Sequence, residues 1–240
     1  MSPTANLHRA LSVILLRPAQ PQGFEVFIAH HPDQPPLLGE RNSFPGGSIQ
    51  KSDRTEAILR RCRGLSGEKA RKILGAHLAP SKALGFWIAA IRTLFQDVGV
   101  FYAITENGEP AGLDAELNAR LLQARTARRD GAQDFPALME RENLFCDAAK
   151  LAYFSHWQTA PDVSRGFEMR FFLAAMRDDQ TPIASATERT HGSWFAPDRA
   201  LQLFGRGELP MAFATFASLR TLADFGNVES VLKEFQRERS

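Results

Sequence analysis

Two stretches of the sequence carry residues that suit phosphate chemistry. Residues 44–47 (FPGG) end in two glycines after a proline, so the backbone there can adopt a positive φ and come close to a ligand. Residues 90–100 carry the oxygen-bearing side chains of Thr93, Gln96 and Asp97 at positions i, i+3 and i+4. Hard oxygen ligands on one helix face can share a divalent cation that keeps several waters. Together the two stretches predict a magnesium-diphosphate site.

A helix must hold the second stretch. Apolar residues recur there at three- and four-residue steps: Leu84, Trp87, Ile88, Ile91, Leu94, Phe95 and Val98. Gly99 stands where a left-handed C-terminal cap is expected. Thr93, Gln96 and Asp97 are then predicted to share the opposite, outward face. The alternative interpretation is that they form only the solvated side of an amphipathic helix.

The rest of the pattern interleaves strands with helices. A hairpin is expected from two apolar strands, and further strands and helices follow it along the chain. The strands are predicted at 11–16, 24–29, 100–105, 151–157, 169–176 and 191–195, and the helices at 113–129, 135–144, 197–204, 211–225 and 228–237. This order favours a mixed sheet covered by helices, an α/β or α+β sandwich.

The domain organisation follows from the same pattern. We expect residues 1–240 to form a single domain. The chain is longer than an average domain, but no evident linker divides it. Residues 54–83 contain short, charged, glycine-broken helical pieces and are predicted to be a helical insertion at the surface. Residues 113–145 are predicted to be an additional helical segment.

Composition excludes several classes of protein. The chain has 29 Lys+Arg against 27 Asp+Glu, a net charge of +2, which disfavours a dedicated nucleic-acid binder. Cys62 and Cys146 form no CxxC pair, so neither a zinc site nor a disulfide is indicated. No stretch approaches the roughly 18 apolar residues of a membrane helix, and no signal-peptide cleavage site follows residues 10–16. We therefore expect a soluble cytoplasmic protein without membrane or nucleic-acid partners.

The residues of the two stretches resemble the box of the Nudix hydrolase family, G-x5-E-x7-R-E-U-x-E-E-x-G-U, where U is aliphatic. Gly47 matches the first glycine, Asp53 stands where the first glutamate belongs, Arg92 matches the arginine and Asp97 the last glutamate. The remaining matches are Leu94, Gly99 and Val100. Between Asp53 and Arg92 lie 38 residues where the family has seven, so 31 residues interrupt the box.

An interrupted box resembles the branch that contains the coenzyme A diphosphatase, Nudix-type motif 19. Residues 157–161 (WQTAP) are similar to its W-x-T-P segment, and residues 167–172 (FEMRFF) are similar to its R-F-D-T-R-F-F strand. Residues 194–201 and 207–210 follow its C-terminal pattern. The resemblance thus covers most of the chain and implies a Nudix-like α/β/α sandwich with a mixed sheet.

The resemblance also implies an activity and a set of site residues. The activity is hydrolysis of a diphosphate linkage in a nucleotide-linked small molecule, either coenzyme A-like or a nucleoside diphosphate derivative, with Mg²⁺ or Mn²⁺. Asp97 and Arg92 are the expected catalytic residues. The expected metal ligands are Asp97, Gln96, Thr93 and Asp53. The expected substrate-binding residues are Arg41, Phe44, Gly46, Gly47 and Phe167.

The departures from the box predict a weak site. Thr93 and Gln96 stand where the family has glutamates, which removes two negative charges and weakens attraction for a dication. Arg92 is expected to lose most of its acidic partners for the same reason. Two hypotheses follow: a weak, metal-demanding hydrolase, or a catalytically silent Nudix fold that binds a nucleotide or a protein partner through the inserted helices. A third, an unrelated α/β binding protein, is excluded if the helix packs beside Gly46 and Gly47.

A few other residues allow two interpretations each. Asp53 and Glu56 could form an auxiliary carboxylate pair or complement a helix dipole. Trp157 could stack on an adenine or pack in the core. His30 and His31 could bind a metal or remain solvated, and the arginines of residues 113–129 could attract nucleic acid or be balanced by nearby acids.

Overall fold

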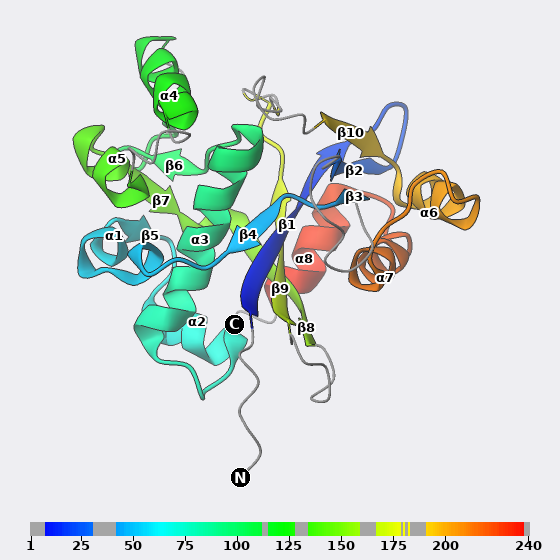
Figure 1. The fold of residues 1–240 in the computed structure, drawn as a ribbon, viewed down its shortest axis with the longest axis horizontal. Coiled ribbons are helices and arrows are strands. Elements are labelled where there is room, and N and C mark those ends of the chain that lie inside the picture. Colours follow the sequence, from blue (N-terminus) through cyan, green and yellow to red (C-terminus); the bar gives the residue numbers. More distant parts are fainter. Residues whose placement is uncertain are drawn as a thin grey trace.

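The computed structural model describes residues 8–30, 42–111, 115–127, 134–158, 167–178, 180, 182 and 191–237. A seven-stranded mixed sheet lies at the centre, with the order β10-β2-β1-β9-β8; β3 pairs with β2 and β4 with β1 (Figure 1). Its strands are β1 (His8–Pro18), β2 (Phe24–His30), β3 (Asn42–Ser43), β4 (Gly46–Ser48), β8 (Leu151–Gln158), β9 (Phe167–Ala175) and β10 (His191–Phe195). The predicted strands at 11–16, 24–29, 151–157, 169–176 and 191–195 are confirmed.

Strand β1 is the centre of the sheet. It forms the predicted antiparallel hairpin with β2 and pairs in parallel with β9 from His8↔Phe167 to Leu16↔Ala175. Its aliphatic residues Leu11 and Val13 to Leu16 are buried on both faces, as a central strand with a parallel neighbour requires. The other side of β1 accepts the short strand β4, and this pairing brings the glycine segment onto the sheet.

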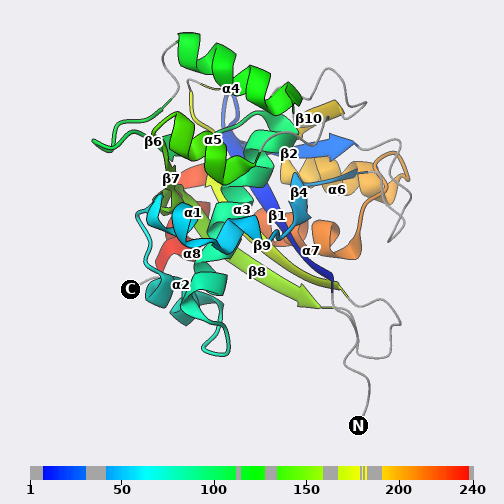
Figure 2. The same cartoon turned by 60° about the vertical axis from the view of Figure 1, so that its left-hand side comes forward.

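Helices cover both faces of the sheet, which gives the predicted α/β/α sandwich (Figures 1 and 2). One apolar core joins the sheet to α3 (Pro80–Val98) and to the shorter helices α1 (Glu56–Arg60), α2 (Gly67–Leu74), α4 (Ala115–Ala127) and α5 (Phe135–Arg141). A second core, on the other face, joins it to α6 (Pro197–Gly205), α7 (Phe213–Leu222) and α8 (Val228–Arg237). None of the described helices is long and apolar enough to cross a membrane.

Helix α3 has the ends that its sequence dictates. Pro80 occupies the first turn, where its missing N–H costs nothing, so the helix begins earlier than the apolar periodicity from Leu84 indicates. Gly99 ends it with φ 72° and ψ 8°, and its N–H donates to the Phe95 carbonyl at 3.1 Å. The predicted left-handed cap is confirmed.

A small second sheet was not predicted. It has the order β5-β7-β6, with β5 (Cys62–Arg63), β6 (Ala103–Ile104) and β7 (Phe145–Asp147). The inserted segment is therefore not purely helical, and the strand expected at 100–105 is only two residues long. Such short strands have no hydrophobic period to detect. Cys62 and Cys146 face each other in this sheet as free thiols, and burial raises the pKa of Cys62 to about 12.

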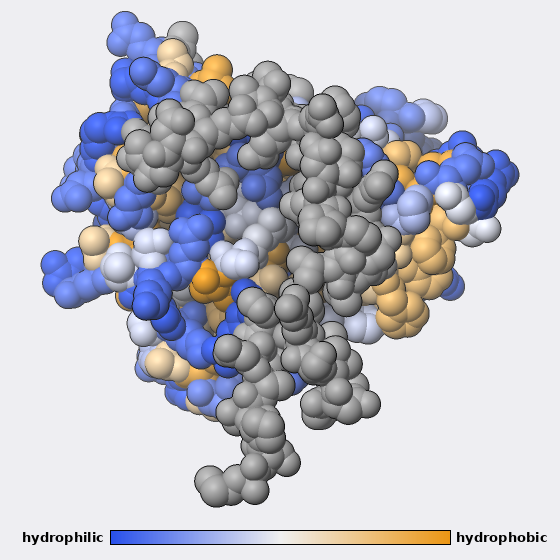
Figure 3. All heavy atoms as spheres, in the orientation of Figure 1, coloured by the Kyte–Doolittle hydropathy of each residue, from blue (hydrophilic) through white to orange (hydrophobic). Residues whose placement is uncertain are grey.

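On the face drawn in Figure 3, an apolar area lies over α6 and α7, on the right of the view. Phe213, at the start of α7, is 69% exposed. Its ring meets Trp157 of β8 edge to face, with centroids 5.6 Å apart. Trp157 therefore packs at this surface against another aromatic ring.

Candidate functional site

The glycine strand β4 packs directly against the C-terminal half of α3. The Gly46 N–H donates to Asp97 Oδ2 at 3.3 Å. A Cβ placed on Gly47 would lie 3.3 Å from Thr93 Oγ1. The predicted packing of the helix beside the two glycines is confirmed, and an accidental match on an unrelated fold is excluded.

The two glycines are required for close packing and not for their φ angles. Neither has a positive φ; both lie in β4, where Gly47 pairs with Leu11 and Gly46 with Ser12 of β1. A Cβ on Gly46 would meet the Leu11 carbonyl oxygen at 2.6 Å and Ser12 Oγ at 2.7 Å. The prediction of a positive-φ turn was wrong, because strand pairing brings the backbones together in an extended conformation.

Thr93 does not face solvent. It is 2% exposed, and its Oγ1 has no hydrogen-bond partner among the residues that the structure describes. Strand β4 lies over this part of α3, whereas Gln96 and Asp97, one turn further on, are half-buried. The predicted outward face was therefore wrong for Thr93, and so was the alternative of a fully solvated helix side.

Asp53 forms a buried ion pair that occupies both of its carboxylate oxygens. Arg92 Nε donates to Asp53 Oδ1 at 2.6 Å, and Arg92 Nη2 donates to Oδ2 at 2.9 Å. The Gln50 N–H also donates to Oδ2, at 2.7 Å, and the Asp53 side chain is fully buried. Both oxygens thus bind protein donors, which disagrees with the expected role of Asp53 as a metal ligand. A carboxylate in this position serves to hold Arg92.

Arg92 joins three elements of the site. Besides Asp53 of η1 (Ser52–Arg54), it donates through Nη1 to Gln96 Oε1 at 2.9 Å and through Nη2 to the Ser48 carbonyl of β4 at 2.9 Å. The side chain is buried, so the geometry gives Arg92 a positioning role in place of the expected catalytic one. Among the described residues Asp53 is the acidic partner that Arg92 keeps, and the other side-chain contact is to a neutral amide. Gln96 is likewise engaged by Arg92.

The sequence pattern did not predict the role of Arg125 at the end of α3. It extends from α4 to the end of α3, where Nε donates to the Gln96 carbonyl at 3.0 Å and Nη2 to the Asp97 carbonyl at 2.7 Å. A buried cation at the negative end of a helix stabilises that end. The charged pattern of residues 113–129 indicated only a surface helix. Nothing local marks which of its arginines turns inward.

The remaining oxygens fit only a weakly held divalent ion. Of the four expected ligands, Asp53 and Gln96 are bonded to Arg92 and Thr93 is covered by β4. Asp97 is the fourth, and its Oδ2 accepts from the Gly46 N–H. Across the residues that the structure describes, no three His, Cys, Asp or Glu side chains gather as a metal site would require. A single carboxylate leaves most of the coordination shell to water.

The expected substrate-binding residues are placed in different ways. Phe44 lies in the core under α6 to α8, 6.3 Å from Phe171 in an edge-to-face contact, so it cannot contact a ligand as expected. Phe167 belongs to β9, where its backbone pairs with His8; its side chain lies outside the described residues. Arg41 also lies outside them.

His30, Glu56 and Arg120, which each allowed two interpretations, contact other protein side chains. His30 Nδ1 lies 2.8 Å from Asn42 Oδ1, while His31 is outside the described residues. Glu56 pairs with Arg60 one turn along α1 at the surface, so it does not join Asp53. Arg120 pairs with Glu142 at 2.9 Å, which supports the balanced interpretation of that helix.

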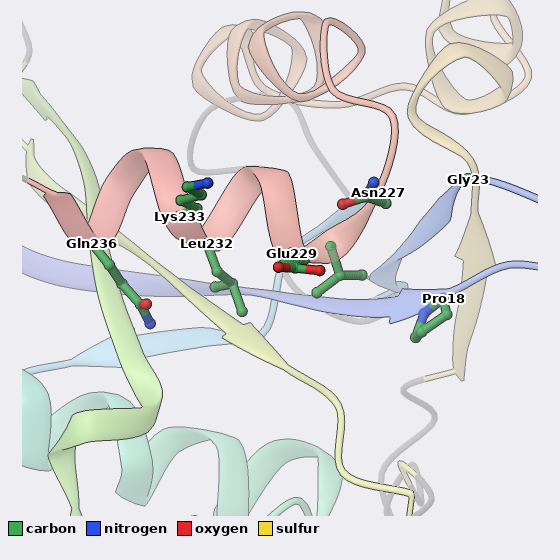
Figure 4. A pocket seen from close by; sticks show the side chains of 8 residues that line it. Pro18, Gly23, Asn227, Glu229, Leu232, Lys233 and Gln236 are labelled. Atoms are coloured by element: carbon green, nitrogen blue, oxygen red, sulfur yellow. The ribbon is translucent and has the colours of Figure 1, made fainter.

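A shallow groove of about 920 Å³ lies elsewhere, between the turn of the β1–β2 hairpin and α8 (Figure 4). It is lined by Pro18, Gly23, Asn227, Val228, Glu229, Leu232, Lys233 and Gln236. Asn227 is already used there, because its Oδ1 accepts from the Ser230 N–H at 2.8 Å. None of the predicted site residues lines the groove.

Comparison with known proteins assigns the architecture. No protein-family model matches the chain. The chain is similar to a NUDIX hydrolase from Alicyclobacillus acidocaldarius, with 20% identity, coverage of 95% of this chain and 96% of that chain, and a TM-score of 0.71. An Ap4A hydrolase from C. elegans gives 11% identity, 91% and 100% coverage, and a TM-score of 0.43. The NUDIX domain of Shewanella oneidensis NrtR, solved with ADP ribose, gives 14%, 92% and 92%, and 0.41.

The first similarity extends over nearly the whole of both chains. At this level of identity it establishes architecture and leaves the activity open. The chain has the Nudix fold.

Proposed function

We propose that the protein is a weak Nudix-type hydrolase that cleaves a diphosphate linkage in a nucleotide-linked substrate, of coenzyme A type or another nucleoside diphosphate derivative. The observation that carries this proposal is the hydrogen bond between Gly46 of β4 and Asp97 of α3. It joins the glycine segment to the carboxylate that the helix keeps. The Nudix fold supports the same conclusion.

In this proposal Asp97 acts on the attacking water, and Arg92 and Asp53 hold the site in position. Asp97 orients the water that attacks phosphorus and accepts its proton. Arg92 and Asp53 keep β4, η1 and α3 in fixed positions, so that Gly46 and Asp97 stay together. A bound Mg²⁺ or Mn²⁺ would supply neutralisation of the diphosphate charge.

The activity is expected to be weak for a physical reason. A dication is held by the sum of its charged ligands, and the box offers Asp97 where the family has three helical carboxylates. Gln96 cannot replace one of them while its amide oxygen accepts from Arg92. Turnover should therefore require millimolar metal.

A second function is favoured by one observation. In the part of the chain that the structure describes, the acidic side chains do not gather into a metal-binding group. A Nudix fold in this state would bind a nucleotide or a protein partner without hydrolysis. The two functions differ in whether Asp97 has a catalytic effect.

One experiment separates them. The wild type, Asp97→Ala and the double substitution Thr93→Glu, Gln96→Glu are incubated with coenzyme A, ADP-ribose and dinucleoside polyphosphates at millimolar Mn²⁺. Turnover in the wild type that is lost in Asp97→Ala supports the hydrolase. Activity that appears only in the double variant supports the silent fold. Asp224→Ala, which removes a surface acid of the Arg220 pair, is the control and should leave turnover unchanged.

Because Thr93 is buried, Gln96→Glu alone is the safer restored variant. Its new carboxylate can keep the Arg92 contact through one oxygen and offer the second oxygen to a metal ion. Wild-type turnover that survives Asp97→Ala would remove Asp97 from the proposal.

A further inference from the structure

A second cluster of charged side chains lies at the opposite end of α3 from Asp97. We call it the Arg170 cluster; its members are Arg9 (β1), Arg54 (η1), Lys82 (first turn of α3), His156 (β8), and Glu168 and Arg170 (β9). Strands β1, β9 and β8 are neighbours in the sheet, and the start of β1 lies beside the end of β8 in Figure 2. The proposed hydrolytic site uses none of these residues.

Glu168 is the acidic centre of the Arg170 cluster. Its Oε2 accepts from Arg9 Nε at 2.8 Å, and its Oε1 accepts from Arg170 Nη2 at 3.1 Å. His156 Nε2 lies 3.5 Å from Oε1. Burial alone would raise the pKa of Glu168, but the Arg9 hydrogen bond and the charges of Arg170 and Arg9 hold it below its usual value. Glu168 is therefore a carboxylate shared between two guanidinium groups.

Arg170 is a buried cation with incomplete compensation. It is 1% exposed, its guanidinium lies 4.9 Å from the centre of the Phe86 ring, and its Nη1 donates to the Leu74 carbonyl at 3.3 Å. Its Nε has no hydrogen-bond partner in the described part of the chain. A buried charge normally has a full set of partners, because taking it out of water is costly. Its Nη1 also donates to the Tyr153 hydroxyl at 3.5 Å, but among the described residues Glu168, shared with Arg9, is the one carboxylate that pairs with it.

Two further cations increase the positive excess. Within the part of the chain that the structure describes, neither Lys82 nor Arg54 has an ion-pair partner. Burial and the positive charges of Arg9, Arg54 and Arg170 lower the pKa of Lys82. Among the described residues the cluster thus sets three arginines and Lys82 against one carboxylate, although the whole chain carries a net charge of only +2. The excess of positive charge is confined to this cluster, and a bound anion would neutralise it.

We propose that the Arg170 cluster binds a phosphomonoester dianion. Arg9 and Arg54 are exposed and Lys82 is partly exposed, so their head groups can contact the phosphate oxygens. Arg170 adds a fixed positive charge from beneath, where low polarity strengthens it. The phosphate can be free or carried by a nucleotide. This site does not depend on the proposed hydrolysis, so either can fail without the other.

The test is binding of phosphate compounds to the full chain by NMR and calorimetry. Inorganic phosphate and adenosine 3′,5′-bisphosphate are titrated at constant ionic strength, with adenosine as the uncharged comparison. The amides of Arg9, Arg54 and Lys82 should shift with the phosphate compounds and not with adenosine. The double substitution Lys82→Gln, Arg54→Gln should weaken binding about tenfold, the loss expected from removing two partly screened charges.

The double variant removes no ion pair, so it should fold normally; its circular dichroism and melting are compared with those of the wild type. Lys233→Gln, which removes an exposed cation of α8, is the matched control and should leave the affinity within twofold of wild type. Shifts with inorganic phosphate identify a site for free phosphate, and shifts with the bisphosphate alone identify a nucleotide-borne group. Equal affinity in the wild type and the double variant overturns the proposal. An adventitious response confined to other surfaces, or tighter binding of an oligonucleotide at physiological salt, also overturns it.

Discussion

The two ends of α3 differ in how completely their charged side chains are paired. Near its C-terminal end each buried cation has a dedicated partner: Arg92 binds Asp53 through two hydrogen bonds, and Arg125 binds the last carbonyls of the helix. Near its N-terminal end, Arg9 and Arg170 share Glu168, while Lys82 and Arg54 have no described ion-pair partner. The same helix therefore begins in a positive excess and ends in a balanced network.

The difference teaches what each arrangement can do. A carboxylate and a guanidinium in bidentate contact fix geometry, and neither has capacity left for a ligand. A shared carboxylate leaves positive potential that a mobile anion can neutralise. The C-terminal end of α3 has the first kind of arrangement, while the second kind lies about twenty ångströms away along the helix, at roughly 1.5 Å per residue.

The largest effect is expected from breaking the balanced end. Asp53→Ala leaves the Arg92 guanidinium buried without its counter-ion, so the free energy of unfolding should fall by about 3–5 kcal/mol. Urea denaturation measures this change. Glu56→Ala is the matched control: it removes an exposed acid three residues away, paired with Arg60 at the surface, and should cost less than about 1 kcal/mol. Equal losses in the two variants would contradict the described burial of the Asp53–Arg92 pair.

The shared carboxylate should have a smaller effect that depends on pH. Because the pKa of Glu168 is lowered on folding, its stabilisation is fully present above the unfolded pKa, which is near 4.5, and is lost as the pH falls through the folded value. Glu168→Gln should therefore cost about 2 kcal/mol at pH 7, the value of charged hydrogen bonds. The difference from wild type should shrink below pH 4.5. A difference that stays constant down to pH 3 would show that packing, and not charge, holds Glu168 in place.

The helix end near Asp97 gives the next effect. Arg125→Met removes a cation and two hydrogen bonds from the last carbonyls of α3, so we expect a loss of roughly 1–2 kcal/mol. Arg125→Lys keeps the charge and should recover part of the loss. Hydrogen exchange of the amides from Leu94 to Gly99 should quicken in the methionine variant. Unchanged exchange would mean that α4 does not stabilise this turn.

Much of this architecture could be predicted from the sequence. The helix ending at Gly99 and the hairpin follow from periodicity and capping, and the contact between Gly46 and the helix follows from the resemblance to a motif that 31 residues interrupt. The short strands of the second sheet could not be predicted, because two or three residues carry no period. The site was harder for a related reason: whether Thr93 faces solvent depends on β4, a strand that lies 45 residues earlier in the chain.

The roles within the site also needed tertiary information. Arg92 and Asp53 were recognised as box positions, yet only their distance shows that they bind each other and not a metal. Arg125 has the same local pattern as Arg120, which pairs with Glu142 at the surface. Glu168 and Arg170 were part of a matched strand, but their excess of positive neighbours arises from β1, η1 and α3 coming together.

The smallest change in stability is expected from removing the cations without a described ion-pair partner at the N-terminal end of α3, and it tests the difference between the two ends most directly. Lys82→Gln and Arg54→Gln remove cations that repel Arg9 and Arg170, so the free energy of unfolding should change by less than about 0.5 kcal/mol, and toward greater stability. In 50 mM phosphate the wild type should gain melting temperature relative to equal ionic strength of chloride, whereas the double variant should gain less. A clear destabilisation by either substitution would reveal a stabilising partner for that cation, and the N-terminal end of α3 would then be balanced like the other.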